Sequence, residues 1–341
     1  MNREIKNILV VNVNWLGDTV FATPVFKALK EYYPGCRVSC LCVPRVYEIL
    51  QMSPFIDEII IYDEKGRDWG IFRKWKIIQE IRRRKFDVAF LLRASISRAL
   101  MLYAAGIPLR VGYKTKTPRF LLSHPVSPLE TDVHRSEEYA YVVKSFQVPV
   151  GDQACELKVP QENLEKMKAS LASLGLDKTR GFIVVNAGGN WDLKRWPAEN
   201  FAALVKRLMR DFKESVLMVG AAKDLDLVEV ITRLSGEKPF VLTGKTDLKD
   251  LAAIFSLAKL FICADTGPLH LASAVGCPSI ALFGPTRPEA TGPRGKGKGI
   301  VLQKDVGCNR APCFHLACQK NVCMQSITVD DVLQTYQNFT H

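Results

Sequence analysis

The residues most able to do chemistry lie in three short loops, each of which joins an apolar run to a helical pattern. The first loop covers residues 12–19, where Gly17 allows a tight turn and Asp18 stands at the start of the next helix. One interpretation makes Asp18 an N-cap that accepts hydrogen bonds from free backbone N–H groups, and the loop taken alone favours it. The alternative is a general base that removes the proton from an acceptor hydroxyl.

The second loop, residues 186–197, carries groups that suit a phosphate. Gly188 and Gly189 let the backbone approach a ligand closely, and Pro197 suits the first turn of the following helix. Lys194 and Arg195 stand just before that helix. Because a Lys-Arg pair is usually solvated, this loop on its own is a weak indication of a site.

The third loop, residues 264–270, gives the sharpest indication of a site. It follows an apolar run, and Thr266, Gly267 and Pro268 open a helix there. Free N–H groups and the positive end of the helix then meet at one point, which predicts an anion site. His270 falls within the first turn, either as a site residue or as a packed helix residue.

Two common nucleotide-binding motifs are excluded. No G-x-G-x-x-G follows an apolar run, so the dinucleotide fingerprint is absent. Residues 292–299 imitate a P-loop, but Gly299 replaces the required Ser or Thr. No strand–helix context surrounds that segment either.

Strand and helix patterns alternate along the chain and must position the three loops. Apolar, β-branched runs occur at residues 7–13, 37–43, 58–62 and 87–92, with helical periods at 22–33 and 69–84. The alternation weakens at 115–156 and restarts at 181–186, after which four further strand patterns and four helical patterns follow. We expect two doubly wound α/β domains, residues 1–160 and 161–341, whose parallel sheets hold ligands beyond the carboxyl ends of their strands.

The composition is that of a folded protein. The 341 residues are 48% hydrophobic and 24% charged, which excludes disorder and collagen. No run of 18 or more apolar residues exists, so no transmembrane helix is expected. The first residues lack the apolar segment and cleavage site of a signal peptide, which predicts a cytoplasmic protein.

Positive charge is concentrated between residues 65 and 120. Fifteen Lys and Arg stand there against three acidic residues, an excess that equals the formal net charge of +12 for the whole chain. Such a concentration indicates an anionic partner at this region, the alternative being a solvated basic helix face. Within it Ile71, Phe72, Trp75 and Ile78 form an apolar stripe at helical spacing. We expect the stripe to face the core, with interfacial membrane contact as the alternative.

Four segments resemble, in order and context, the motifs of the ADP-heptose:lipopolysaccharide heptosyltransferases, glycosyltransferase family 9. They are Asn-Trp-Leu-Gly-Asp-Thr at 14–19, Lys-Arg-Trp-Pro at 194–197, Asp-Thr-Gly-Pro-Leu-His at 265–270 and Ala-Leu-Phe-Gly-Pro-Thr at 281–286. The resemblance runs from about residue 7 to the C-terminus. The Trp-Leu-Gly-Asp form and the cysteine-bearing tail are more similar to the heptosyltransferase II branch.

This resemblance implies a GT-B fold, in which two Rossmann-like domains face a cleft. The N-terminal domain would bind the acceptor and the C-terminal domain the ADP-sugar donor. The implied reaction is an inverting, metal-independent transfer of heptose from ADP-heptose to an inner-core lipopolysaccharide acceptor, with no cofactor. Asp18 matches the base, and Lys194 matches a catalytic phosphate-binding position. The implied donor-binding residues are Gly189, Asn190, Lys194, Asp224, Thr246, Asp265, Thr266, Gly267 and His270.

The basic region lies in the half that would hold the acceptor. Inner-core acceptors are anionic and lipid-anchored, so Arg93, Arg98 and Arg119, at or beyond a strand end, are the candidate acceptor contacts. Peripheral contact with the cytoplasmic face of the inner membrane is a further expectation. Two alternatives remain: a GT-B enzyme for another sugar nucleotide or acceptor, and a basic nucleic-acid-binding protein. The second is disfavoured, since no nucleic-acid motif is present.

Four of the ten cysteines repeat at five-residue steps in the tail: Cys308, Cys313, Cys318 and Cys323. We expect them to be buried free thiols with a structural and not a catalytic role. Structural zinc, with His315 able to replace one thiolate, is an alternative, although equal steps lack the usual C-x₂₋₄-C pairs. Disulfides are a third alternative, which a cytosolic location disfavours. The six other cysteines lie in apolar segments, where Cys acts as a small hydrophobe.

Overall fold

A computed structural model describes residues 5–115, 117–176, 181–308, 312–313, 318 and 320–340. The chain divides into two compact units, Met1–Lys158 and Val159–His341, and each is described by itself. Among the described residues, no helix has the length and apolar character needed to cross a membrane.

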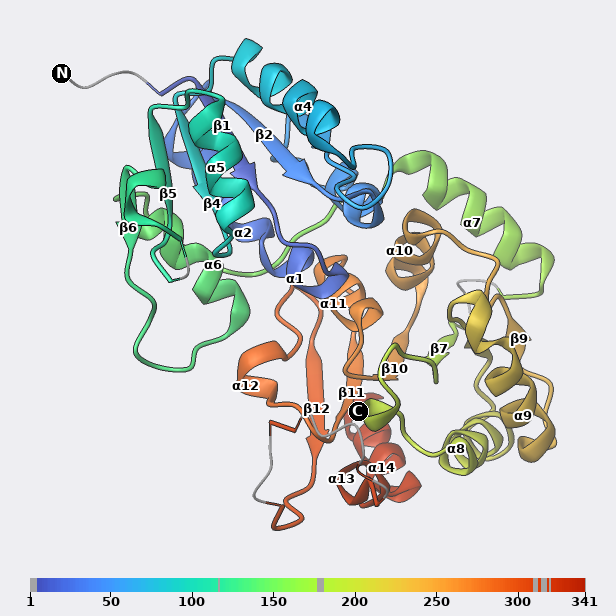
Figure 1. Cartoon of the computed structure of the whole chain (residues 1–341). Coiled ribbons are helices and arrows are strands. Elements are labelled where there is room, and N and C mark those ends of the chain that lie inside the picture. Colours follow the sequence, from blue (N-terminus) through green and yellow to red (C-terminus); the bar gives the residue numbers. More distant parts are fainter. Residues whose placement is uncertain are drawn as a thin grey trace. The chain divides into compact units, whose positions relative to one another are not determined.

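The first unit is one parallel sheet with helices on both faces (Figure 1). Its strands are β1 Asn7–Val11, β2 Arg37–Cys42, β3 Glu58–Ile61, β4 Val88–Leu91, β5 Leu109–Tyr113 and β6 His124–Val126. Its helices are α1 Leu16–Phe21, α2 Thr23–Tyr32, α3 Tyr47–Gln51, α4 Ile71–Arg83, α5 Ile96–Ala104 and α6 Arg135–Lys144, with short 3₁₀ turns at Pro44–Val46 and Arg119–Leu121. The strand order is β3-β2-β1-β4-β5-β6, and every described pairing is parallel.

The second unit repeats the same plan. Its strands are β7 Ile183–Asn186, β8 Val216–Met218, β9 Phe240–Val241, β10 Leu260–Ala264, β11 Ser279–Phe283 and β12 Gly299–Gln303. Its helices are α7 Gln161–Ser173, α8 Ala198–Arg210, α9 Leu225–Ser235, α10 Leu248–Leu257, α11 Gly267–Ala274, α12 Pro288–Thr291, α13 Val322–Gln325 and α14 Val329–Thr340, with 3₁₀ turns at Asp192–Lys194 and Ala222–Asp224. The order β12-β11-β10-β7-β8-β9 is again parallel throughout the described pairings.

Read in chain order, both sheets run 3-2-1-4-5-6. The prediction of two doubly wound α/β halves is therefore confirmed. The strand order reverses between β1 and β4 in the first unit and between β7 and β10 in the second. Loops that leave these neighbouring strands diverge to opposite faces, which opens a crevice at the carboxyl ends. The three loops singled out in the sequence follow β1, β7 and β10, at these two points.

The helix predicted at 22–33 is confirmed as α2, Thr23–Tyr32, and a further short helix, α1, precedes it and meets it at Ala22. Pro24 explains the break, because proline lacks the N–H that would bond to the carbonyl of Val20 four residues earlier. The Thr23 hydroxyl donates to that carbonyl instead, at 2.8 Å. The first helix thus begins inside the loop that carries Asp18, a point that the periodicity did not show.

The expected core-facing stripe on α4 is wrong for three of its four residues. Ile71, Phe72 and Trp75 are exposed, whereas Ile78 is half-buried and packs against the core beside Ile77 and Ile81. Because each helical residue turns by about 100°, Ile77 and Ile81 lie on another side of α4 from the three exposed residues. Apolar residues occupy two faces of this helix, and the spacing alone did not distinguish the buried one.

Helices α4 and α5 cover one face of the first sheet and share a core with Leu9 and Val11 of β1. Helices α1, α2 and α6 contact one another in a separate cluster. In the second unit, α8, α9 and α14 pack over β7, β8 and β11 in one continuous core. The sequence pattern missed α3, α5, β5, β6 and α6 in the first unit and α7 and β12 in the second. Of these, β6 and α6 lie in the stretch 115–156, where the strand–helix alternation weakens.

Candidate functional site

Asp18 is not the N-cap of its helix. The N-cap of α1 is Trp15, no side chain caps that end, and Asp18 is the third helical residue. Its Oδ1 instead accepts a hydrogen bond of 2.9 Å from the hydroxyl of Tyr139. Tyr139 is buried on α6 and is 121 residues away in sequence, so the tertiary fold alone makes this contact. The capping interpretation therefore fails.

The surroundings of Asp18 adjust its acidity in opposite directions. Burial raises the pKa of Asp18, and the hydrogen bond from Tyr139 and the charges of Arg135 and Arg93 lower it by less, so the net pKa is raised. Glu138 adds a small upward contribution. Burial and the neighbouring carboxylate also raise the pKa of Tyr139, which keeps its hydroxyl protonated as a donor. A carboxylate with a raised pKa among polar neighbours is suited to accept a proton.

Arg93 and Arg119, two of the predicted acceptor contacts, are exposed. Arg93 follows β4 by two residues, across the switch point from Asp18, and its charge reaches the carboxylate. Arg119 begins the turn Arg119–Leu121. The structure thus brings Arg93 to Asp18, while no described contact links Arg119 to it.

Arg98, the third predicted acceptor contact, is buried in α5. Its guanidinium lies 4.2 Å from the centroid of the Tyr62 ring, and its Nη2 is 3.4 Å from Glu64 Oε2. These contacts hold the segment that follows β3 against α5. Arg98 is therefore engaged within the fold.

In the second unit Lys194, Asp265 and Thr286 form a compact polar cluster. Lys194 Nζ lies 2.6 Å from Asp265 Oδ2, and the Thr286 hydroxyl donates to the same oxygen at 2.7 Å. Asp265 is buried, and Lys194 is partly open to solvent. An ammonium group has three N–H donors, so this ion pair orients Lys194 and leaves it capacity for an anionic ligand.

His270 joins this cluster from α11. Its Nε2 lies 3.7 Å from Asp265 Oδ1, and the side chain is buried in the first turn of the helix. Thr266 is the N-cap of α11 and has extended backbone, while Gly267 is the first helical residue. The helix therefore begins beside the Lys194–Asp265 pair, and its first N–H groups and positive end favour an anion there.

The β7 loop is held close to its neighbours. A Cβ on Gly188 would lie 2.3 Å from the carboxylate of Asp224, so glycine is required at this point. A Cβ on Gly189 would be 3.4 Å from Cγ2 of Thr266, which shows how near the loops after β7 and β10 approach. Arg195 Nη2 fixes the loop by donating to the Gly189 carbonyl at 2.7 Å.

The remaining predicted donor residues lie at the edge of this arrangement. The carboxylate of Asp224 accepts from the Ala221 N–H at 3.0 Å, within the turn that precedes α9. Asn190 Oδ1 accepts from Lys223 Nζ at 2.6 Å. Thr246 is half-buried in the loop between β9 and α10, with no described contact to the other predicted residues.

Three side chains at these sites escaped the sequence reasoning. Thr286 lies within the Gly-Pro-Thr segment already noted, but its bond to Asp265 depends on the pairing of β10 with β11. Tyr139 and Arg135 come from α6, in the part of the chain where the strand–helix alternation fades. Nothing in the local sequence marks them.

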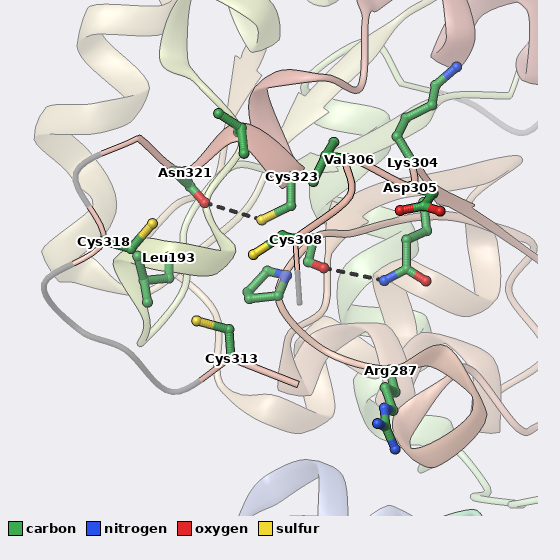
Figure 2. A pocket seen from close by; sticks show the side chains of 14 residues that line it. Leu193, Arg287, Lys304, Asp305, Val306, Cys308, Cys313, Cys318, Asn321 and Cys323 are labelled. Atoms are coloured by element: carbon green, nitrogen blue, oxygen red, sulfur yellow. Dashed lines mark hydrogen bonds between the residues drawn. The ribbon is translucent and has the colours of Figure 1, made fainter. Parts of the chain in front are cut away.

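The four tail cysteines line a pocket of about 410 Å³ beside Leu193 (Figure 2). Cys308 is exposed and the other three are half-buried, so the expectation of burial is wrong for them. These cysteines follow β12, the last strand, so they do not lie within the sheet, where the packing of helices would bury them. The six other cysteines are buried, as expected. No group of three or more metal-ligating side chains is found in the described parts of the chain, and His315 lies outside them.

Comparisons with known proteins agree with this picture. The family model described as glycosyltransferase family 9 (heptosyltransferase) matches residues 74–323. The lipopolysaccharide heptosyltransferase 2 of Salmonella typhimurium is 27% identical over 297 residues, which cover 84% of this chain and 85% of that protein. A putative glycosyltransferase of Haemophilus influenzae is 26% identical over 338 residues, covering 96% and 95% of the two chains.

Solved structures match over nearly the whole chain. The glycosyltransferase family 9 structure from Veillonella parvula has a TM-score of 0.89 at 24% identity, covering 99% of this chain and 98% of that one. The structure of E. coli ADP-heptose lps heptosyltransferase II has a TM-score of 0.79 at 23% identity and covers 98% of each chain. These matches confirm the predicted GT-B fold class.

Proposed function

The chain belongs to glycosyltransferase family 9, and from this membership we propose that it transfers heptose from ADP-heptose to an inner-core lipopolysaccharide acceptor. The transfer inverts the anomeric centre and needs no metal. The second heptose of the core is the proposed addition, because heptosyltransferase 2 proteins recur among the relatives. The observation that carries the proposal is the Lys194–Asp265–Thr286 cluster beside the start of α11, a site suited to a diphosphate.

The chemistry of an inverting transfer is one displacement. The acceptor oxygen attacks the anomeric carbon, the bond from that carbon to the diphosphate oxygen breaks on the opposite face, and ADP leaves with the bonding electrons. Asp18 takes the hydroxyl proton in this step, and Tyr139 holds the carboxylate in one orientation. Because burial raises its pKa, Asp18 is a stronger base than an ordinary exposed carboxylate.

The leaving diphosphate gains negative charge in the transition state, so fixed positive groups are most effective there. We assign this role to Lys194 and to the first N–H groups of α11, at Thr266 and Gly267. Asp265 and Thr286 hold Lys194 in place, and His270 lies beside Asp265 on the same side of the proposed diphosphate site. These groups could offset the charge that a divalent cation offsets in metal-dependent glycosyltransferases.

The remaining assignments extend the proposal to the two substrates. Gly189 and Asn190 approach the phosphates, and Asp224 and Thr246 lie toward the nucleoside. On the acceptor side, Arg93 binds anionic groups beside the base and Arg119 binds them farther out. Since Arg98 is buried against Tyr62 and Glu64, we propose that it does not touch the acceptor and instead holds the segment after β3 in place beside the acceptor site.

The acceptor is carried on a lipid anchor, so we propose that the enzyme acts at the cytoplasmic face of the inner membrane. The basic region of residues 65–120 supports this location, since it would attract an anionic acceptor and an anionic leaflet.

A transfer assay read by mass spectrometry tests the proposal. The purified chain is incubated with ADP-heptose and with core acceptors that carry either one heptose or none. We expect one heptose to be added to the one-heptose acceptor and the Asp18→Asn variant to add almost none. Transfer from another sugar nucleotide in preference to ADP-heptose would contradict the donor assignment. Preference for the acceptor without heptose would contradict the assignment to the second heptose.

A further inference from the structure

The N-terminal part of α4 and the segment before it expose large apolar side chains that the proposed chemistry does not use. Trp69, Ile71 and Phe72 are 75%, 77% and 84% exposed, and Trp75 is 52% exposed. Single exposed apolar residues are ordinary, but four within seven positions form a patch of the kind that marks a contact surface. The core contacts of α4 lie on another side of the helix, at Ile77 and Ile81.

Helix α5 presents a second exposed apolar face. Ile96, Leu100 and Tyr103 are each about half exposed and are spaced four and three residues apart, so they share one side of the helix. The buried residues of α5, among them Ala99 and Leu102, lie on the opposite side.

Side-chain contacts join these two faces. The Arg82 guanidinium lies 6.0 Å from the centroid of the Trp75 ring and donates to the carbonyl of Ala104, the last residue of α5. The Tyr103 ring in turn meets the exposed Phe120 ring edge-on, with centroids 6.4 Å apart. We call the joined surface the α4–α5 face. Both helices cover the same side of the first sheet (Figure 1).

The charge of the α4–α5 face is one-sided. Arg73, Lys74, Lys76 and Arg83 are exposed between and beside the apolar residues, and none forms an ion pair with a described carboxylate. Arg84 does pair, with Glu58 and Glu80, at the edge of this face. The surface is therefore aromatic and cationic together.

We propose that the α4–α5 face docks on an anionic lipid bilayer, with α4 lying in the plane of the membrane interface. Tryptophan and phenylalanine would enter the headgroup region, while Arg and Lys reach the lipid phosphates with their long side chains. Lysine is depleted from protein–protein interfaces, so Lys74 and Lys76 among aromatic residues favour a lipid partner over a protein one. This inference deepens the proposed function and rests on it, because the proposed function identifies the membrane as the one that carries the acceptor.

Vesicle binding tests the docking surface without any substrate. The full chain is floated with vesicles of phosphatidylcholine alone or mixed with phosphatidylglycerol. We expect binding to the anionic vesicles, weakened by salt, and quenching of tryptophan fluorescence by bromine-labelled acyl chains. Phe72→Ser and Lys74→Glu should each weaken binding at least about fivefold.

Matched controls carry the same chemical changes on helices α2 and α6, which contact each other away from the α4–α5 face. Tyr32→Ser changes an exposed aromatic residue of α2, and Lys144→Glu reverses an exposed charge of α6. We expect both controls to bind anionic vesicles as the unchanged protein does. Equal weakening by the controls, or equal binding to vesicles of either composition, would overturn the proposal. A dimer in sedimentation velocity that Phe72→Ser dissociates, without vesicle binding, would assign the face to a second copy of the chain and also overturn it.

Transfer to a short acceptor without its lipid separates this inference from the proposed function. Phe72→Ser, which changes no charge, should keep turnover on that acceptor and lose it on the same acceptor embedded in anionic vesicles. Vesicle binding that depends on Phe72, together with no heptose transfer by any variant, would leave the docking surface standing and refute the proposed reaction.

Discussion

Replacing Asp18 by asparagine tests the central chemical assignment. The amide has the same shape as the carboxylate, and its oxygen can still accept the 2.9 Å hydrogen bond from Tyr139. The Asp18→Asn variant would therefore keep the local structure and lose only the ability to take a proton. General base catalysis contributes about 10²–10⁴-fold, so turnover should fall by at least about 10²-fold, or about 2.7 kcal/mol of transition-state stabilisation.

Binding of ADP serves as the internal control for Asp18→Asn. The proposed donor residues, among them Lys194 and Asp265, lie in the second unit, whereas Asp18 lies in the first. ADP affinity measured by calorimetry should therefore stay within about threefold, which is about 0.65 kcal/mol. Near-normal turnover in this variant would refute the role of Asp18 as base.

The acidity of Asp18 gives a second readout. The base must be ionised to act, so turnover should decline toward acid pH through the pKa of Asp18, which burial raises above its ordinary value. The Tyr139 hydrogen bond lowers that pKa, and Tyr139→Phe should therefore move the acidic limb of the pH profile to still higher pH. A limb that stays in place, or moves to lower pH, would contradict the contact.

The same shift predicts the sign of the stability change. Because the folded state raises the pKa of Asp18, the ionised carboxylate opposes folding at pH above that pKa and has no such effect below its unfolded value. Asp18→Asn should melt at the same or a higher temperature than the unchanged chain near neutral pH, and the difference should shrink as the pH falls. A clear loss of thermal stability at neutral pH would show that the carboxylate is structural.

Three further changes probe the second unit. Lys194→Ala should weaken ADP binding, slow turnover and lower the melting temperature, because it leaves the buried Asp265 without its cation at a cost of up to about 3 kcal/mol. Adding Asp265→Asn to this variant should restore the stability but not the ADP affinity. Unchanged kinetics in Lys194→Ala would remove Lys194 from the site. Chelation with EDTA should leave transfer intact, and activity lost in chelator but restored by magnesium or manganese would refute the metal-free proposal. Cys313→Ser and Cys318→Ser should keep turnover and ADP affinity, and a folded variant with normal ADP binding and little turnover would overturn the structural role of these cysteines. Elemental analysis should find no zinc, and about one zinc per chain would overturn the expectation of free thiols.

The sequence by itself determined the two α/β units and placed the loops of the candidate site. The reason is that alternating strand and helix patterns are local, and parallel crossovers of one hand permit few sheet orders. Loops after β1, β7 and β10 had to lie at carboxyl ends, so Asp18, Lys194 and Asp265 became candidates from residue type and position, while their proposed roles came from the family resemblance. The resemblance to glycosyltransferase family 9 also rested only on short local motifs, those that contain Asp18, Lys194 and Asp265 and the segment at 281–286.

Partners that are distant in sequence were decided by the tertiary structure. Tyr139 reaches Asp18 because α6 packs against α1, and Thr286 reaches Asp265 because β11 pairs with β10. The local sequence indicates neither contact, because side chains that can form hydrogen bonds are common. Which of them become partners depends on which helices and strands are neighbours in the folded sheet. The capping interpretation of Asp18 failed for the same reason.

The α4 stripe shows the limit of periodicity most clearly. Hydrophobic spacing identifies an apolar side of a helix, but it does not say what covers that side. In α4 two apolar sides compete, and the sheet takes Ile77 and Ile81 while Phe72 and Trp75 remain exposed. Only the packing of α4 and α5 on the same sheet face decides which residues become core and which become surface, because burial is a property of the assembled layers and not of the helix.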